Sequence, residues 1–405
     1  MPLFLMLSGF SLTVVYGRKR YKSVNLCCSE TNDLEDQTTN EKLLKDSSND
    51  SQDLNSLNIS GFYQNRCARV IPVYYLTMLL TIPYSLAGFG VMSPDDLYAP
   101  QTIIVNIIPV STLFSFTLGG PLDGVAWTVC TLCVFWVFFP YFLTQYQGLT
   151  DSQLVSKIVA MFYWQLVLLI VGVLGILAVG GNFWVAFATG TMNPITRIPL
   201  FIMGICAGLL CVRHPIAAEM SDKDPDPLPW PKPYISLFPC GTSTSGATDW
   251  TALTRQVSLN LLFLTLFWAA IDSFIYDIIG AVFLQAIVPY AQLTVVVGLT
   301  RDCSVTNTVY NFLVHPVNLW LGKISMTIYL LHYVFIMYVC WIVYGHSLTW
   351  CDAMDKDADC DDFNDARVMP TWGIPAVIVT TLITSPIIYS YFEEPMRKFM
   401  QVQKK

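Results

Sequence analysis

The stretch Asn65–Pro72, with the sequence Asn-Arg-Cys-Ala-Arg-Val-Ile-Pro, opens a long apolar run and decides how the chain is interpreted. Two arginines three residues apart share one face of a helix, so Arg66 and Arg69 stand together where a predicted membrane helix begins. They have two explanations. Either they anchor and orient the helix on the cytosolic side, or their guanidinium groups bind a phosphate-rich ligand.

The composition predicts a membrane protein. Of the 405 residues, 54% are hydrophobic and 13% are charged, whereas about 25% of residues are charged in a soluble domain. Apolar runs close to the length of a membrane span recur along the chain. These runs lack the alternation of barrel strands, so helices are the structure that satisfies their backbone hydrogen bonds in lipid. We therefore expect an all-α, polytopic transmembrane helix bundle, a multi-pass integral membrane protein, with residues 1–405 forming a single domain.

Nine spans are expected in this bundle. A short apolar run covers 2–16, and the other expected spans are 67–88, 122–145, 158–180, 196–213, 256–272, 279–300, 322–344 and 372–392. Asn106 and Pro109 break the apolar segment 101–118, which we interpret as re-entrant or interfacial. With that segment not crossing, the basic tail 393–405 falls in the cytosol, as the positive-inside rule requires, and the loop 345–371 lies outside.

The net charge of −7 is concentrated in one segment. Residues 29–60 hold eight acids and two lysines and almost no aromatic residues. This composition is typical of disorder, so we predict a disordered, acidic, cytosolic loop over 23–62. The rest of the chain is nearly neutral, so no nucleic-acid partner is expected. A second cytosolic loop, rich in proline, is expected over 214–252.

The twelve cysteines show no paired spacing of the kind that binds zinc, so no metal site is predicted. Cys351 and Cys360 differ from the other cysteines because they flank a short acidic loop. If that loop faces an oxidising space, these two residues form a disulfide.

A polar stripe follows the penultimate predicted span. Ser325, Tyr329 and His332 are spaced so that they fall on one face of a helix. Polar residues in a membrane helix are costly and usually face the bundle interior or a cavity. His332 is therefore either a general base or a neutral histidine that is hydrogen-bonded to a neighbouring helix.

Four further residues are candidates for shaping a site. Asp123 and Trp127 mark the beginning of an aromatic span, where Asp123 is either a helix N-cap or a functional carboxylate. Arg197 begins another span and is either an anchor or a phosphate ligand, and Gly204 and Gly208 after it predict a helix-packing face. Glu393 lies near the C-terminus of the last helix, where an acid is unfavourable, so we expect it to have a partner such as a cytosolic arginine.

Six of these sequence elements, in this order, resemble the membrane-bound acyltransferase-3 family, which includes sugar O-acetyltransferases. The matching elements are Leu7–Leu12, Arg66–Arg69 before Pro72, Trp127–Val129 with Pro140, Arg197 with Phe201, Gly204 and Gly208, Leu321–His332, and Phe392–Pro395. The resemblance implies a bundle of about ten helices that transfers an acyl group, with acetyl the expected one, from cytosolic acyl-CoA to a hydroxyl of a carbohydrate or lipid-linked acceptor.

The resemblance also assigns roles. Arg66, Arg69 and Arg197 would bind the substrate, and Trp127, Ser325, Tyr329 and Glu393 would shape the site. Asp123 is a further site-shaping candidate because of its place at the start of the Trp127 helix. Acyl-CoA would be a co-substrate, with no permanently bound cofactor. The expected partners are acyl-CoA, the acceptor and membrane lipid.

Two departures from the family pattern leave an alternative open. The family pattern begins one helix earlier, and that helix carries the histidine proposed as catalytic, which leaves His332 as the candidate base here. The family also usually has a glutamate five residues after the tryptophan, where this chain has Leu132. The alternative is a catalytically inactive family remnant or a transporter-like membrane protein.

Overall fold

The protein is described here from a computed structural model. The described residues are 2–29, 59–86, 104, 106–109, 111–114, 124–178, 192–214, 257–258, 260–261, 288–301, 308–344 and 372–400. Throughout these residues the regular secondary structure is helical, which confirms the all-α class.

Six of the described helices are long and apolar enough to cross a membrane. They are α3 (Ile59–Leu86), α6 (Trp127–Gln147), α7 (Asp151–Ala178), α9 (Pro194–Arg213), α14 (Pro316–Tyr344), and the continuous run of α15 (Gly373–Ile388), the π-helical turn η5 (Tyr389–Glu393) and α16 (Glu394–Met400). Shorter apolar stretches lie in α1 (Pro2–Ser29) and α12 (Val288–Arg301), and α13 (Thr308–Leu313) is a short helix before α14. The multi-pass architecture is confirmed.

The described helices run into the ends of two predicted segments, the loop 23–62 and the tail 393–405, whose predicted bounds stay predictions. α1 continues to Ser29 and α3 begins at Ile59, so both ends of the predicted loop 23–62 are helical. At the other end of the chain, helix continues to Met400, so the predicted tail from 393 begins inside a helix. In each case the helix carries polar residues beyond its apolar run, because a helix is not obliged to end where the hydrocarbon layer ends. The predicted span 256–272 falls largely outside the described residues.

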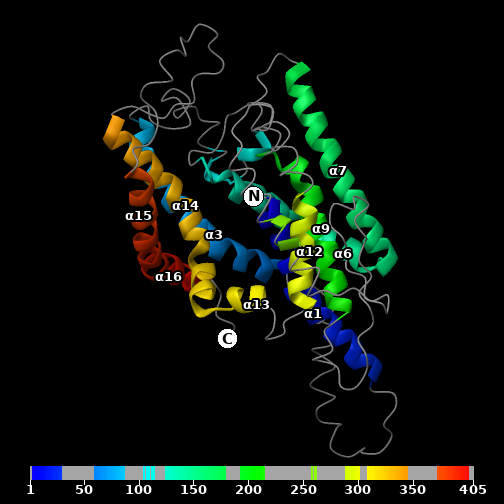
Figure 1. Ribbon diagram of the computed structural model, residues 1–405. Coiled ribbons are helices and arrows are strands. Elements are labelled where there is room, and N and C mark those ends of the chain that lie inside the picture. The colour runs from blue at the N-terminus through cyan, green and yellow to red at the C-terminus, as the bar shows by residue number, and fades with distance from the viewer. Residues whose placement is uncertain are drawn as a thin grey trace, which may run out of the picture. The chain divides into compact units, whose positions relative to one another are not determined.

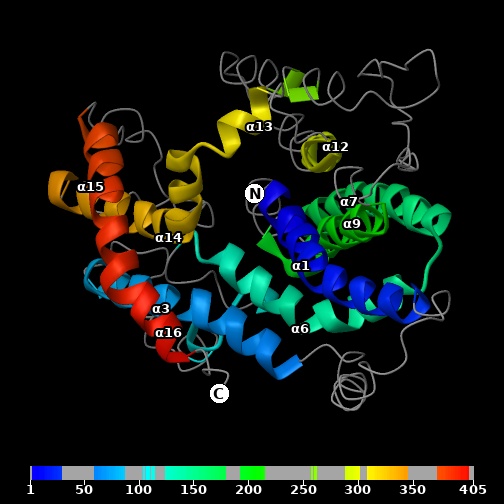
Figure 2. The ribbon, with the colours of Figure 1, turned by 90° about the horizontal axis from the view of Figure 1, so that it is seen from below.

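The chain divides into two compact units. Unit 1 comprises Met1–Ile59, Phe138–Leu169 and Arg197–Phe312, and unit 2 comprises Ser60–Val137, Ile170–Thr196 and Leu313–Lys405. Unit 1 contains α1, α12 and most of α7 and α9, and unit 2 contains α3, α14, α15 and α16. Figures 1 and 2 show α3, α14 and the α15–α16 run alongside one another within unit 2.

In unit 1, α1 and α9 cross with their backbones almost touching. A Cβ atom on Gly204 would lie 2.1 Å from the Met6 carbonyl oxygen and 2.9 Å from the Phe10 nitrogen. A Cβ on Gly208 would lie 2.9 Å from the Phe10 carbonyl oxygen. The predicted packing face at these two glycines is confirmed, since only glycine permits this approach.

In unit 2, tyrosines of α3 hold the segment that was predicted to be re-entrant. Tyr74 and Tyr75 lie near the middle of α3 and donate to the carbonyl oxygens of Asn106 (2.8 Å) and Ile107 (2.6 Å). The described part of the segment continues as a 3-10 turn, Ser111–Phe114. Irregular backbone at membrane depth needs such donors, because lipid supplies none.

Candidate active site

The arginine pair lies near the start of α3. This helix has 28 residues and is therefore about 42 Å long, which exceeds the roughly 30 Å thickness of the hydrocarbon layer. Its first turns can therefore reach the headgroup region. Arg66 is half-buried, with its guanidinium carbon 6.0 Å from the centroid of the Phe62 ring, and Arg69 is exposed. The predicted role of the two arginines in binding a ligand stays a prediction.

Glu393 is buried in the π-helical turn η5, with 1% of its surface exposed. The Thr327 hydroxyl on α14 donates to its Oε2 at 2.5 Å. The positive charges of Arg69 and Arg397 also act on this carboxylate. Within the described residues, the hydrogen bond between Thr327 and Glu393 links α14 to the last helix. The expected pairing of Glu393 with an arginine stays a prediction.

Further charges lie around the neighbouring carboxylate, Glu394. Lys398 forms an ion pair with Glu394 at 3.0 Å, and Lys323 and Arg397 also act on Glu394. Gln64 of α3 donates to the Met400 carbonyl at 2.7 Å, which holds α16 against α3. We call this region of unit 2 the basic end; it consists of Arg66, Arg69, Lys323, Arg397 and Lys398 together with Glu393 and Glu394. Its five cations outnumber its two acids, so it attracts anions.

The predicted polar stripe on α14 divides in two. Ser325 is exposed, and its hydroxyl donates to the Gly322 carbonyl at 2.9 Å, so this residue does not face the bundle interior. Tyr329 is half-buried and donates to the Val125 carbonyl just before α6 at 3.1 Å. His332 is also half-buried, and its Nδ1 donates to the Tyr329 carbonyl at 2.5 Å. In the neutral ring this leaves the lone pair on Nε2, the form that a general base needs.

His332 and Thr327 stand on different faces of α14. Five residues separate them, which corresponds to about 140° around the helix and about 7.5 Å along its axis. Thr327 faces Glu393 at the basic end, whereas Tyr329, on the His332 side, faces the turn before α6. A ligand that contacts both the basic end and His332 must therefore extend from one face of α14 to another.

The start of α6 packs closely on α14. A Cβ on Gly124 would lie 2.6 Å from Cζ of Tyr333, so the end of this tyrosine side chain would have to shift to admit it. Trp127 begins α6 and is buried. Leu132, at the position of the family glutamate, is also buried, with 2% of its surface exposed. Asp123 lies outside the described residues.

Arg197 belongs to unit 1 and is only 1% exposed, unlike Arg69. It stands in the first turn of α9. Its predicted role, as an anchor or as a phosphate ligand, stays a prediction. The predicted disulfide, Cys351–Cys360, lies outside the described residues. No cluster of three or more metal-ligating side chains occurs within the described ranges.

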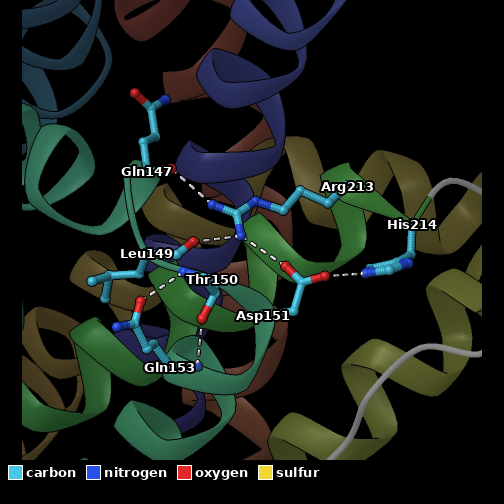
Figure 3. Close-up of polar contacts among 7 residues, drawn as sticks. All are labelled: Gln147, Leu149, Thr150, Asp151, Gln153, Arg213 and His214. Atoms are coloured by element: carbon cyan, nitrogen blue, oxygen red, sulfur yellow. Dashed lines mark hydrogen bonds and ion pairs between the residues drawn. The ribbon is translucent and has the colours of Figure 1, made fainter.

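Sequence reasoning missed an ion-pair cluster in unit 1 (Figure 3). Arg213, the last residue of α9, donates to the carbonyls of Gln147 (2.8 Å) and Leu149 (2.7 Å) and to Asp151 Oδ1 (2.7 Å). His214 Nε2 lies 2.7 Å from Asp151 Oδ2. Nothing in the sequence marked this pairing, because 62 residues separate Arg213 from Asp151. The cluster fastens the end of α9 to the connection between α6 and α7.

A capping box begins α7 at the same place. The Thr150 backbone N–H donates to Gln153 Oε1 at 2.8 Å, and the Gln153 N–H donates to Thr150 Oγ1 at 3.4 Å (Figure 3). This reciprocal pair satisfies two N–H groups that the helix cannot satisfy itself. The motif Thr-x-x-Gln before an apolar run would have predicted this helix start.

Comparisons with known proteins identify the family. The family model described as an acyltransferase domain, acyltransferase-3, matches residues 1–390. Searches of curated proteins and of solved structures found no match. The match covers almost the whole chain and agrees with the multi-pass helical architecture. The chain therefore belongs to the acyltransferase-3 family of membrane acyltransferases.

Proposed function

We propose that this acyltransferase takes its acyl group, typically acetyl, from acyl-CoA and transfers it to a hydroxyl of a carbohydrate or lipid-linked acceptor. The observation that carries the proposal is the basic end of unit 2. CoA carries several phosphates, and Arg69 and Arg397 lie near the buried Glu393 while Lys323 and Arg397 lie near Glu394 beside it. Arg66 stands one turn before Arg69 on α3. Guanidinium groups bind phosphate through paired, charge-assisted hydrogen bonds.

The predicted topology supports the same assignment. Acyl-CoA is a cytosolic donor, and a surplus of lysine and arginine marks cytosolic helix ends. The starts of α3 and α14 and the end of α16 all contribute cations to the basic end. The donor phosphates would bind there, and the thioester arm would extend around α14 toward His332.

In the proposed reaction His332 acts as the general base. Its Nε2 takes the proton of the acceptor hydroxyl while the oxygen attacks the thioester carbonyl. The carbon–sulfur bond then breaks, and the imidazolium returns the proton to the departing thiolate. The products are the acyl ester and free CoA, so no other reactant is needed. The Tyr329 carbonyl, bonded to Nδ1, favours the tautomer with a basic Nε2.

The experiment compares donor kinetics of the full chain with single variants at the basic end. Arg69→Ala and Arg66→Ala should each raise the KM for acetyl-CoA about tenfold, since a charge-assisted hydrogen bond contributes about 1.5 kcal/mol or more. Lys157→Ala, which removes a cation of unit 1 that lies over the Tyr146 ring, is the control. An unchanged KM in the Arg66→Ala, Arg69→Ala double variant contradicts the donor site.

A separate variant tests the base. His332→Ala should lower kcat by about 100-fold or more while the KM for acetyl-CoA changes little, because general base catalysis contributes roughly that factor. His332→Ala with full kcat would remove His332 from the mechanism and leave the donor site intact.

A further inference from the structure

The first two turns of α14 form an exposed segment beside the basic end. Every residue from Pro316 to Lys323 is exposed or half-buried, and Trp320 has 45% of its surface exposed. α14 has 29 residues and is about 43 Å long, so it extends past a hydrocarbon layer of roughly 30 Å. Trp320 precedes the charged Lys323 by one turn and is further from the apolar part of the helix. Because a lysine avoids the hydrocarbon layer, the Trp320 ring lies at headgroup level or beyond.

Helix geometry places Trp320 on the face of α14 that meets the last helix. Thr327, whose hydroxyl donates to Glu393, is seven residues after Trp320 and therefore within about 20° of it around the helix axis. Lys323 is three residues after Trp320, within about 60°. The charge of Lys323 acts on Glu394. Trp320 thus lies on the stripe of α14 that faces the basic end.

The start of α14 and the end of α16 lie at the same end of unit 2. Moving outward from the contact between Glu393 and Thr327 means moving back along α14 and forward along α16. Figure 1 shows the first turns of α14 (yellow) and α16 (red) at the lower end of unit 2, with the start of α15 at the opposite end. Arg397 and Lys398 stand in the last turn of α16. This end of unit 2 therefore combines positive charges with an exposed indole ring.

We infer that Trp320 is a stacking platform for the adenine of acyl-CoA, while cations of the basic end bind the phosphates of the same molecule. The inference rests on the proposed acyl-CoA donor and names the part of the donor that Trp320 recognises. Adenine stacks on an aromatic side chain through its π face, and this contact needs no particular hydrogen bonds. Lys323, one turn away on the same stripe of α14, supplies a positive charge for a phosphate of the nucleotide.

The order of residues along α14 matches the order of chemical groups in acyl-CoA. In that molecule the phosphates lie between the adenine and the pantetheine arm, which ends in the thioester. Along α14 the ring of Trp320 comes first, and the charge of Lys323 follows one turn later. His332 is 12 residues after Trp320, about 18 Å along the helix. A donor bound in this direction places its adenine at the outer end of α14 and its thioester toward the proposed base.

The test measures ligand binding to the full chain in neutral detergent by equilibrium dialysis. The probes are CoA and its two halves, adenosine 3′,5′-bisphosphate and 4′-phosphopantetheine. We expect Trp320→Leu to raise the Kd for CoA and for adenosine 3′,5′-bisphosphate about tenfold, because stacking on an aromatic side chain contributes roughly that factor for one base. The Kd for 4′-phosphopantetheine, which has no adenine, should not change. Trp320→Phe keeps an aromatic ring and should retain most of the affinity.

The matched control is Trp372→Leu. Trp372 is 56% exposed and stands immediately before α15, at the end of unit 2 opposite to the start of α14. A tryptophan that only anchors a helix at headgroup level has no preference for adenine, so Trp372→Leu should leave the Kd of all three probes unchanged. The Tm of each variant without ligand checks that the fold is kept, which we expect because both tryptophans are exposed.

Three results would overturn the inference. If Trp320→Leu weakens 4′-phosphopantetheine as much as CoA, or if Trp320→Phe binds as weakly as Trp320→Leu, the ring does not recognise adenine. If Trp320→Leu binds CoA like the wild type while the Arg66→Ala, Arg69→Ala double variant does not, Trp320 is excluded and the donor site stands. If the wild-type chain binds neither CoA nor adenosine 3′,5′-bisphosphate, the proposed donor and the role of Trp320 are both wrong.

Discussion

Two helix contacts in this protein are held together by different means. In unit 1, α1 and α9 meet through glycines, and the contact contains almost no side chain between the backbones. In unit 2, α14 meets the last helix through a buried carboxylate and a hydroxyl, Glu393 and Thr327. Lipid is as apolar as leucine, so the hydrophobic effect does not hold helices together within the bilayer. One contact therefore depends on close van der Waals packing and the other on a polar interaction.

The largest loss of stability is expected when a side chain is added at the glycine contact between α1 and α9. Gly204→Ala should destabilise the protein by at least about 3 kcal/mol, because the new Cβ meets the backbone of α1, which cannot move aside like a side chain. The measurement is denaturant unfolding in mixed micelles. Gly175→Ala is the control, since nothing lies within 4 Å of a Cβ there. Equal stability of the two variants would show that α1 and α9 do not depend on this approach.

The glycine contact was predictable from the sequence, whereas the polar contact was predictable only in part. Gly204 and Gly208 repeat at a spacing that itself specifies a packing face. The sequence predicted a partner for Glu393, because an acid is unfavourable at a helix C-terminus. Its partner Thr327 could not be inferred, because a threonine in an apolar helix carries no signal and 66 residues separate the two.

The second-largest loss of stability is expected at the polar contact between α14 and the last helix. Glu393→Ala should cost about 2–3 kcal/mol, because it leaves the Thr327 hydroxyl without its acceptor and removes the negative charge that acts on Arg69. Glu393→Gln should cost only about 1 kcal/mol, since the amide oxygen still accepts from Thr327. The comparison is made by unfolding in mixed micelles. Equal losses in the two variants would mean that charge, and not the hydrogen bond, holds this contact.

Arg213 should have a smaller effect, although it makes three hydrogen bonds. Arg213→Ala is expected to cost about 2 kcal/mol, because the side chain is partly exposed and water replaces some of what is lost. Asp151→Asn should cost less, since Arg213 keeps its two carbonyl acceptors. Both are measured by unfolding. A larger loss in Asp151→Asn would show that the ion pair matters more than the contacts to the end of α6.

The ion-pair cluster around Arg213 was not predictable from the sequence, and the basic end was predictable only in part. Arg66 and Arg69 could be identified from the sequence, because residues three apart on one helix share a face. Lys323 and Arg397 belong to the basic end only because the fold brings them close to Glu394. Periodicity identifies the faces of a helix but does not state which faces meet.

The smallest loss of stability is expected at the capping box of α7, which is not part of either helix contact. Thr150→Ala should cost about 1 kcal/mol, since an N-cap hydroxyl satisfies one backbone N–H at the start of α7. Gln153→Ala should cost less, because water reaches the exposed Thr150 N–H that it leaves. The double variant should cost less than the sum of the two single variants, because each side chain bonds the backbone of the other residue. Strict additivity in this cycle would mean that the two hydrogen bonds form independently.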